Sequence, residues 1–323
     1  MRLTREALEE AATVVRAVVP PTPQRRWPLL EGRAGCEVWV KHENHAPTGA
    51  FKVRGGITYV RSLREREPGV RGVLAATRGN HGQSVAFAAA RAGLTAVVVV
   101  PHGNSREKNA AMRAFGAELI EHGQDFQEAF EYAARLADER GLHCIGAFAE
   151  SLVIGVATYA LELFEAVPDL DAVYVPIGMG SGMCGVIGAR DALGLRTRVI
   201  GVVSEALPSY QRSFEAGRPV TTPPAETIAD GLACRVPNPE AVAVIRAGAE
   251  RVVAVSEAGI RAAMRCYFTD THNVVEGAGA APLAALLAER DRMRGKRVAV
   301  VASGGNVDAR VFRDVLAEGA EGV

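Results

Sequence analysis

Residues 172–185 read Ala-Val-Tyr-Val-Pro-Ile-Gly-Met-Gly-Ser-Gly-Met-Cys-Gly, which places a short apolar run directly before a glycine-rich turn. The apolar run is typical of a strand, and the glycines are typical of a turn that opens a helix. Residues 97–100 and 298–301 are continuous apolar runs, as expected for strands that are buried on both faces. Because runs of this kind alternate with helical patterns, the sequence predicts an α/β protein with mostly parallel sheets.

The same alternation extends along most of the chain. Strands are expected at 37–41, 72–76, 96–100, 118–121, 172–176, 198–203 and 297–302. Helices are expected where apolar residues recur every three or four positions, among them 105–115, 126–140, 155–167 and 257–268. Residues 217–239 contain five prolines and predict a long surface loop, which in a compact α/β protein often borders a site.

Composition bounds the class of protein. The 323 residues suit two domains, and 37 basic side chains balance 37 acidic ones, so a nucleic-acid stripe or an anionic-membrane anchor is not expected. The N-terminus lacks a signal-peptide pattern, and the most apolar stretch, 94–101, falls far below the ~20 residues that span a bilayer. Scattered cysteines without a paired spacing predict reduced thiols in a cytoplasmic protein, without disulfides or zinc; they are Cys36, Cys144, Cys184, Cys234 and Cys266.

The first turn with chemical character is Thr48-Gly-Ala-Phe-Lys-Val-Arg54. Thr48 is expected to cap a helix that opens at Gly49 and Ala50, which puts Lys52 in the first helical turn. Lys52 is one of only four lysines in the chain, and the simpler interpretation is a solvated lysine. However, burial and the positive end of the helix dipole would both lower its pKa, which would free the amine for Schiff-base chemistry.

The second turn, Thr77-Arg-Gly-Asn-His-Gly-Gln83, follows an expected strand and precedes a helix expected to begin near Ser84. Backbone N–H groups at such a helix start suit a carboxylate or phosphate, and Asn80 adds an amide donor. A structural turn that simply needs glycine is equally compatible. His81 alone is more often a structural histidine than a base.

The third turn is the glycine-rich segment 178–185, which can cradle a phosphate. It lacks the GK[ST] of a nucleotide P-loop. Gly180, Gly182 and Gly185 also spell GxGxxG, with Glu205 after the next strand. That order is the dinucleotide fingerprint, so an NAD(P)-dependent oxidoreductase is a second interpretation.

The fourth turn, Ser303-Gly-Gly-Asn-Val-Asp308, again follows a strand, and taken alone it is a tight turn capped by Ser303. Turns at the carboxyl ends of parallel strands converge on one crevice. Together the turns offer an amine, a phosphate cradle, an amide and a hydroxyl. These groups match the aldehyde, phosphate, phenolic oxygen and ring nitrogen of pyridoxal phosphate, whereas a nicotinamide enzyme explains only the third turn.

Together these segments resemble the fold-type II pyridoxal-phosphate enzymes, most closely the serine/threonine dehydratase (threonine ammonia-lyase) and serine racemase group. The resemblance also covers Thr227–Gly231 and Glu276–Gly279, so it spans almost the whole chain. It implies two open, mostly parallel twisted sheets flanked by helices, as in the tryptophan synthase β-like fold. It further implies a large cofactor-binding domain of residues 1–65 plus 151–323, a small substrate-side domain of residues 66–150, and no C-terminal regulatory domain.

The resemblance also implies roles for individual residues. Lys52 would hold the cofactor and act as the base at Cα, and Phe51 would pack beside the ring. Asn80 would hydrogen-bond the phenolic oxygen, and Ser303 the ring nitrogen. The phosphate would be bound by Gly178, Met179, Gly180, Ser181 and Gly182. The substrate would be bound by Thr77, Arg78, Gly79, Asn80 and His81.

The chain departs from the family pattern at several positions. Ser181 stands in a cradle that is usually all glycine, but its hydroxyl can still donate to phosphate. Thr77 replaces the first serine of its turn, which is a tolerable exchange. Arg78 replaces the serine with which racemases handle a proton, which argues against racemisation. Val203 and Ser209 stand where racemase-like members hold a divalent cation, so no metal is expected, although Glu205 lies nearby.

The activity that the resemblance implies is catabolic β-elimination, in which a β-hydroxy amino acid such as L-threonine or L-serine yields a 2-oxo acid and ammonia. Arg78 raises an alternative, because a guanidinium could accept a second carboxylate, as in 3-hydroxyaspartate. Phenylserine dehydratase, serine racemase, a β-replacement enzyme and a non-catalytic binding protein are further alternatives. The partner is expected to be a small amino acid, and a homodimer or higher homo-oligomer is expected from the resemblance alone.

Overall fold

The structure is a computed structural model that describes residues 3–124 and 126–318. It contains a six-stranded sheet in the order β1-β2-β10-β7-β8-β9 and a four-stranded sheet in the order β5-β4-β3-β6. All neighbouring strands pair in parallel except β1 and β2. The strands are β1 (Gln24–Arg26), β2 (Glu37–His42), β3 (Gly72–Ala76), β4 (Thr95–Val100), β5 (Glu118–Glu121), β6 (His143–Cys144), β7 (Ala172–Pro176), β8 (Arg198–Ser204), β9 (Arg251–Val255) and β10 (Arg297–Ala302).

Helices cover both sheets. The α-helices are α1 (Arg5–Arg16), α2 (Pro28–Ala34), α3 (Lys52–Arg66), α4 (Asn80–Arg91), α5 (Arg106–Ala114), α6 (Phe126–Arg140), α7 (Glu150–Ala166), α8 (Ser181–Ala192), α9 (Ser209–Ala216), α10 (Pro239–Gly248), α11 (Glu257–Thr271), α12 (Gly277–Ala288), α13 (Arg290–Met293) and α14 (Ala309–Ala317). Short 3₁₀ turns lie at η1 (Glu43–His45) and η2 (Asp230–Leu232). Within the described ranges, no helix combines the length and the apolar character that crossing a membrane would require.

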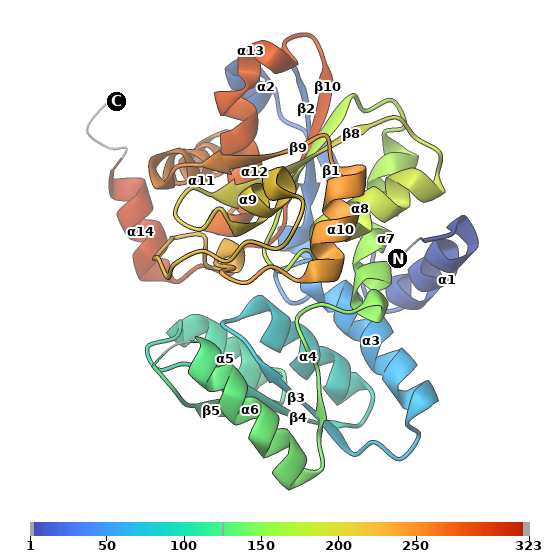
Figure 1. Cartoon of the computed structure of the whole chain (residues 1–323). Coiled ribbons are helices and arrows are strands. Elements are labelled where there is room, and N and C mark those ends of the chain that lie inside the picture. Colours follow the sequence, from blue (N-terminus) through green and yellow to red (C-terminus); the bar gives the residue numbers. More distant parts are fainter. Residues whose placement is uncertain (1–2, 125, 319–323) are drawn as a thin grey trace.

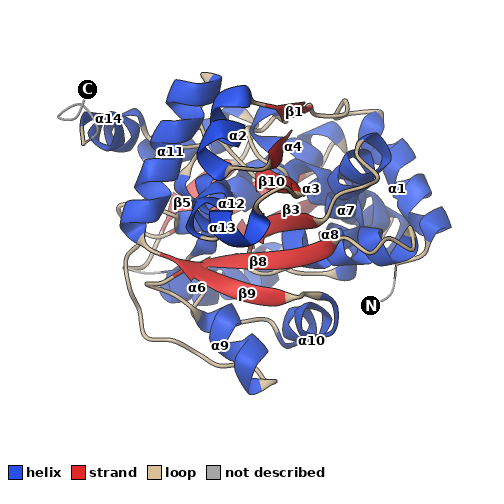
Figure 2. Ribbon diagram, turned by 90° about the horizontal axis from the view of Figure 1, so that it is seen from above, coloured by secondary structure: helices blue, strands red, loops and turns tan. Residues whose placement is uncertain are grey.

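The six-stranded sheet is buried on both faces, and β7 shows why its sequence is continuously apolar. Val173 and Val175 pack into a core with α7, α8 and α10. The alternate residues Ala172 and Tyr174 pack into a second core with α2, α11 and α12. Figure 2 shows β8 and β9 running between α11, α12 and α13 on one side and α9 and α10 on the other. The strand period of two therefore supplies both helix layers from one run of apolar residues.

The four-stranded sheet forms the lower part of the molecule in Figure 1, with α4, α5 and α6 around it. Val73 and Ala75 of β3 face a core that includes residues of α3 and α4. Leu74 and Ala76 face a separate core with α6. This part is therefore a second doubly covered parallel sheet with cores of its own.

A buried ionic cluster connects α3 to the six-stranded part. Arg54, on α3, is fully buried and forms ion pairs of 2.8 Å with Glu43 and with Glu162 of α7. Lys41 of β2 is also fully buried and pairs with Glu162 at 2.7 Å. Burial alone would raise the pKa of Glu162, but Arg54 and Lys41 lower it below its ordinary value. The cluster holds the first turn of α3, and hence Lys52, against the larger sheet.

The α/β class and the parallel sheets are confirmed, and all seven expected strands are present, with ends that agree within one residue. β1, β6 and β9 were not expected. The first two are only three and two residues long, which is too short for a periodic signal. The long loop from Gly217 to Asn238 is present, interrupted only by η2.

The expected caps and several helix starts were wrong, including that of α7, which begins at Glu150 rather than at residue 155. Thr48 does not cap α3, which begins at Lys52; its hydroxyl instead donates to the Ala50 carbonyl at 3.3 Å. Helix α4 begins at Asn80 rather than near Ser84. Ser303 caps no helix, because α14 begins only at Ala309. The connections before α3 and α14 are therefore longer than expected and that before α4 is shorter, and all three form part of the site described next.

Candidate active site

Lys52 occupies the first position of α3, after the loop that follows β2 and η1. Its Nζ donates a hydrogen bond to Ser181 Oγ at 2.9 Å and lies 4.9 Å from the centre of the Phe51 ring. Burial lowers the pKa of the Lys52 amine to about 8. At neutral to mildly alkaline pH a substantial fraction of the amine is thus uncharged and able to act as a nucleophile or base.

The glycine-rich turn between β7 and α8 brings the chain into close contact with its neighbours. A Cβ on Gly178 would clash with the Gly231 carbonyl oxygen, and Gly180 has a φ of +100°. A Cβ on Gly182 would touch the Phe51 ring at 3.4 Å. Within the described structure, the backbone N–H groups of residues 178–183 have no hydrogen-bond acceptor. The turn and the start of α8 therefore present a set of unpaired donors suited to a phosphate.

Backbone contacts join the Lys52 turn to the Ser303 turn. The Phe51 N–H donates to the Ser303 carbonyl at 3.0 Å, and the Gly305 N–H donates to the Gly49 carbonyl at 2.9 Å. Ala50 and Gly304 form an isolated β-bridge. Ser303 is buried, and its hydroxyl has no hydrogen-bond partner in the part of the chain that the structure describes. This hydroxyl can therefore serve a group from outside the chain.

Asn80, at the start of α4, connects the four-stranded part to the same turns. Asn306 Nδ2 donates to Asn80 Oδ1 at 2.9 Å and to the Thr48 carbonyl at 2.8 Å. Asn80 Nδ2 donates to Glu276 Oε1 at 2.6 Å. Together with the Lys52–Ser181 hydrogen bond, these contacts join all four turns. The most distant pair, Thr48 and Asn306, is 258 positions apart in the sequence.

Glu276 belongs to a buried group of charges beside Asn80. Lys108 of α5 donates to Glu276 at 3.3 Å and to Asp230 of η2 at 2.5 Å. Burial raises the pKa of Glu276, an effect that Lys108 opposes. Burial would lower the pKa of Lys108, but Glu276 and Asp230 raise it above its ordinary value, so the amine stays charged. Lys108 thereby connects the four-stranded part to the six-stranded part.

The turn at 77–81 combines buried and exposed groups. Thr77 Oγ1 is buried and accepts from the Gly79 N–H at 3.1 Å. A Cβ on Gly79 would lie 2.5 Å from Lys108 Cδ, so that lysine covers the turn. Burial, and to a lesser extent the charge of Lys52, lowers the pKa of His81 to about 4. Arg78 is exposed, and within the described residues its guanidinium makes no hydrogen bond or ion pair.

The expected site residues therefore lie in turns that direct contacts join, although the Arg78 side chain in one of these turns is exposed and contributes no such contact among the described residues. Sequence analysis missed the charged and amide groups that surround them. Lys108 was signalled only by the scarcity of lysine, and Asp230 and Glu276 only by their presence in matched segments. Asn306 lies in the turn at 303–308, but nothing in the sequence indicated that its amide would hydrogen-bond to Asn80.

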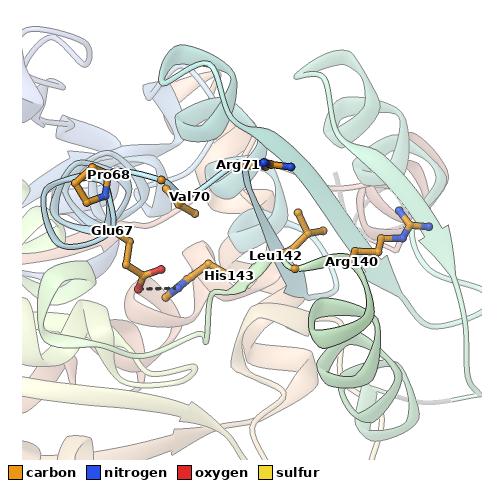
Figure 3. A pocket seen from close by; sticks show the side chains of 9 residues that line it. Glu67, Pro68, Val70, Arg71, Arg140, Leu142 and His143 are labelled. Atoms are coloured by element: carbon orange, nitrogen blue, oxygen red, sulfur yellow. Dashed lines mark ion pairs between the residues drawn. The ribbon is translucent and has the colours of Figure 1, made fainter.

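A separate surface hollow lies away from these turns. It is lined by residues 67–71 and 140–143, which lie around the amino ends of β3 and β6, whereas the Asn80 turn follows the carboxyl end of β3. Figure 3 shows its Glu67–His143 pair, whose oxygen and nitrogen are 3.3 Å apart. Binding at the carboxyl ends of parallel strands favours the turns over this hollow as the functional site.

The site residues fit pyridoxal phosphate on structural grounds. Lys52 offers an amine with a lowered pKa, and the amides of residues 178–183 offer unpaired donors for a dianion. The Ser303 hydroxyl and one N–H of the Asn80 amide remain without a partner among the described residues. Each polar substituent of the cofactor therefore has a matching group within this set of turns.

Comparisons with known proteins agree with this geometry. A family model described as "Pyridoxal-phosphate dependent enzyme" matches residues 15–304. The chain is 36% identical to an L-threonine ammonia-lyase of Thermotoga maritima, over 98% of this chain and 79% of that protein. Its fold matches a solved threonine deaminase from T.th. with a TM-score of 0.89 and 34% identity, covering 95% of this chain and 99% of the other. It also matches a pyridoxal 5'-phosphate-dependent aspartate racemase with a TM-score of 0.91 and 30% identity, covering 96% and 98%.

Proposed function

The chain belongs to the family of pyridoxal-phosphate dependent enzymes, and from that premise we propose that it is a deaminating dehydratase acting on a β-hydroxy amino acid. L-Threonine and L-serine are the preferred candidates. The products are a 2-oxo acid and ammonia, after loss of water. Similarity to a threonine ammonia-lyase along almost the whole chain supports this proposal over an NAD(P)-dependent oxidoreductase.

Lys52 is the central residue of the proposed reaction. When bound, pyridoxal phosphate supplies an aldehyde that captures amines and a ring that stabilises negative charge at the substrate Cα. The Lys52 amine would hold the coenzyme, and in its uncharged form it would accept the proton from the substrate Cα. Ser181 Oγ, 2.9 Å from Nζ, orients the amine at the edge of the phosphate cradle. The Phe51 ring lies against Gly182 and would pack beside the cofactor ring.

The surrounding turns bind the cofactor and the substrate and orient them relative to Lys52. Amides of residues 178–182 bind the phosphate, and the turn at 77–81 binds the substrate carboxylate at the start of α4. The N–H groups of Thr77 and Gly79 are already bonded within the chain, so the amides of residues 78, 80 and 81 are the available donors. Ser303 would offer a neutral hydroxyl to the ring nitrogen, which, unlike a carboxylate, would not require that nitrogen to carry a proton.

The observation that carries the proposal is the Lys52 amine hydrogen-bonded to the phosphate cradle, with a pKa of about 8. Purified protein supplied with pyridoxal phosphate should absorb visible light, and borohydride should attach the coenzyme to Lys52. Serine and threonine should then yield pyruvate and 2-oxobutyrate, measured as 2-oxo acids. A colourless protein, or reduction that leaves Lys52 unlabelled, would contradict the proposal.

A second candidate substrate class is a β-hydroxy amino acid with another carboxylate, such as 3-hydroxyaspartate. Arg78 lies in the proposed substrate turn and has no charged partner among the described residues. One solved structure similar to this chain is that of an aspartate racemase. Aspartate, like 3-hydroxyaspartate, carries a second carboxylate. A guanidinium matches a carboxylate in shape and charge.

Arg78→Ser separates the two substrate classes. Loss of one charge-assisted pair should lower kcat/KM for 3-hydroxyaspartate by about tenfold or more relative to threonine. Arg71→Ser is the matched control, because it removes another exposed arginine outside the turn. An unchanged ratio in Arg78→Ser would assign Arg78 to the solvated surface.

We further propose that the chain divides into a cofactor-binding domain of residues 1–65 plus 151–323 and a substrate-side domain of residues 66–150. Two separate sheets support this division, although the core on one face of the smaller sheet also takes in residues of α3. A cytoplasmic location, a catabolic role and a homo-oligomeric state are also proposed. Sedimentation analysis of the purified protein tests the last of these.

A further inference from the structure

We propose that Glu276 is a positioning residue that acts through Asn80 and fixes the hydrogen bond that Asn80 gives to the phenolic oxygen of the cofactor. The inference rests on the proposed role of Asn80 as the partner of that oxygen. Glu276 itself does not need to touch substrate or cofactor. Its effect is to decide which way the Asn80 amide faces.

The contacts of the Asn80 amide determine its orientation. A side-chain amide has an acceptor oxygen and an NH₂ group with two donors. Asn306 donates to Oδ1 at 2.9 Å, while Nδ2 donates to Glu276 Oε1 at 2.6 Å. Turning the amide by 180° would set its NH₂ against the NH₂ of Asn306 and its oxygen against a carboxylate. Both contacts would then be repulsive, so one orientation is strongly preferred.

This orientation leaves one N–H of Asn80 for the cofactor, because the NH₂ group has no second acceptor among the described residues. A hydrogen bond from that N–H stabilises the deprotonated phenolic oxygen, since donors to a charged oxygen are the stronger kind. Without Glu276 the amide could turn and present its oxygen instead. The phenolic oxygen would then retain its proton more often.

Glu276 is itself held firmly enough to serve as a reference point. It is 3% exposed, and its backbone N–H donates to the Gly304 carbonyl at 3.0 Å. Its carboxylate lies so close to Gly304 that a Cβ there would be 2.5 Å from Oε1. Gly304 follows Ser303 directly, so the same backbone places the group proposed for the ring nitrogen and the carboxylate that orients Asn80.

The competing explanation is that Glu276 only neutralises Lys108, with which it forms an ion pair of 3.3 Å. Two substitutions separate these roles. Glu276→Ala removes both the ion pair and the acceptor of Asn80. Lys108→Met removes the ion pair but leaves the carboxyl oxygen that accepts from Asn80. A purely structural role predicts the same result for both variants.

The test measures the absorption of the protein loaded with pyridoxal phosphate, together with the dissociation constant of the cofactor. Glu276→Ala should raise the ratio of the near-ultraviolet form to the visible form by about tenfold, the scale of one hydrogen bond to a charged oxygen. Lys108→Met should change this ratio by less than about twofold. Asn306→Ala, which releases Oδ1 without touching the buried charges, should shift the spectrum in the same direction as Glu276→Ala.

Asn80→Ala tests the premise that Asn80 donates a hydrogen bond to the phenolic oxygen of the cofactor. The double variant Asn80→Ala/Glu276→Ala should have the spectrum of Asn80→Ala alone, because both substitutions remove one interaction. Additive shifts, or equal shifts in Glu276→Ala and Lys108→Met, would overturn the inference. If Glu276→Ala does not fold, an unshifted Asn306→Ala overturns it. An unshifted Asn80→Ala removes its premise, whereas a protein that binds no cofactor at all contradicts the proposed function instead.

Discussion

A single amine at the start of α3 illustrates how position changes the chemistry of a residue. Lysine usually stays charged at neutral pH, but burial lowers the pKa of Lys52 to about 8. Its nearest described partner is a neutral hydroxyl, Ser181, rather than a carboxylate. Lys108 shows the opposite case, since Glu276 and Asp230 keep it charged despite burial. Two lysines near the site, one partly buried and one buried, therefore differ in charge because their neighbours differ.

The first prediction concerns how fast the protein without cofactor captures pyridoxal phosphate. Only the uncharged Lys52 amine attacks the aldehyde, and the amine is protonated below its pKa of about 8. The capture rate should therefore rise about tenfold per pH unit up to roughly pH 8 and then level off. Stopped-flow absorption of the wild-type protein measures this rate, with Lys52→Ala as the blank. A rate that is flat between pH 6 and 8 would contradict the assignment.

The sequence predicted the residues whose side chains carry distinctive chemistry, but not those that orient them. Lys52, Asn80 and Ser303 lie in turns that follow strands and carry recognisable sequence motifs. Glu276 acts through a hydrogen bond to a residue 196 positions away, and no local pattern reports such a partner. Thr48 was expected to be a cap, yet the backbone after it continues in a loop that pairs with the Ser303 turn.

At the scale of elements, the turn between β7 and α8 depends on backbone approaching backbone. Gly178 lies against the Gly231 carbonyl, which belongs to η2 in the long proline-containing loop. A side chain there would push apart the phosphate cradle and the loop that carries Asp230. The cradle is thus shaped by contact with a loop distant in sequence as well as by its own glycines.

The second prediction follows from that contact. Gly178→Ala should weaken binding of pyridoxal phosphate by at least about tenfold, because its Cβ would clash with the Gly231 carbonyl oxygen. Gly32→Ala is the matched control, since a Cβ on Gly32 in α2 meets nothing within 4 Å. Titration of each apoprotein with the cofactor gives the dissociation constants. Equal affinity in both variants would show that the turn can relax.

Most of the strands that the sequence predicted have buried apolar residues on both faces, β5 being an exception with a partly exposed sequence. β7 and β10 supply cores on either side of their sheet, and that double burial produces the continuous apolar runs. β1 and β6 have only three and two residues and depend on pairing with neighbouring strands, so their own sequences carry no signal. β9 lies at the edge of its sheet and is only partly buried.

The third prediction concerns the ionic cluster that joins β2, α3 and α7. Glu162→Gln should lower the free energy of unfolding at pH 7 by about 3–5 kcal/mol, because Lys41 and Arg54 lose a buried partner. Arg54 and Lys41 hold the folded-state pKa of Glu162 below 4.5, so its contribution is present above pH 4.5 and lost as pH falls through that lower pKa.

Urea unfolding of the apoprotein at several pH values measures this effect. The difference between wild type and Glu162→Gln should shrink as the pH is lowered below 4.5. Glu165→Gln, on the same helix but with an exposed side chain, should change stability by less than about 0.5 kcal/mol. A difference that stays constant with pH would place the stabilisation outside this carboxylate.

At the scale of the whole molecule, a few charged and amide groups join the two sheets beside the proposed site, in addition to the apolar core around α3. Lys108 comes from the four-stranded part, while Glu276 and Asp230 come from the six-stranded part. Asn80 and Asn306 add hydrogen bonds across the same junction. These contacts lie beside the residues proposed to bind the cofactor. We therefore expect a change in these contacts to affect both the stability of the fold and the binding of the cofactor.

The fourth prediction tests this coupling. Lys108→Met keeps the aliphatic cover over Gly79 but leaves Glu276 without its cation, and it should destabilise the apoprotein by about 3–5 kcal/mol. Lys296→Met, which removes a lysine without an ion pair in the described chain, should have an effect below about 0.5 kcal/mol. Urea unfolding measures both. Similar stabilities would mean that the junction contributes little to the fold.

The scarcity of lysine has a practical consequence. Lys41 and Lys108 are buried in ion pairs, and Lys52 is expected to be covered once coenzyme is present. Among the lysines, only Lys296 remains open to reagents that modify primary amines, and it directly precedes the amino end of β10, while Ser303 follows the other end. If the cofactor-bound protein is coupled to a resin through the Lys296 side chain, the proposed active site at the opposite end of β10 should remain accessible from solution.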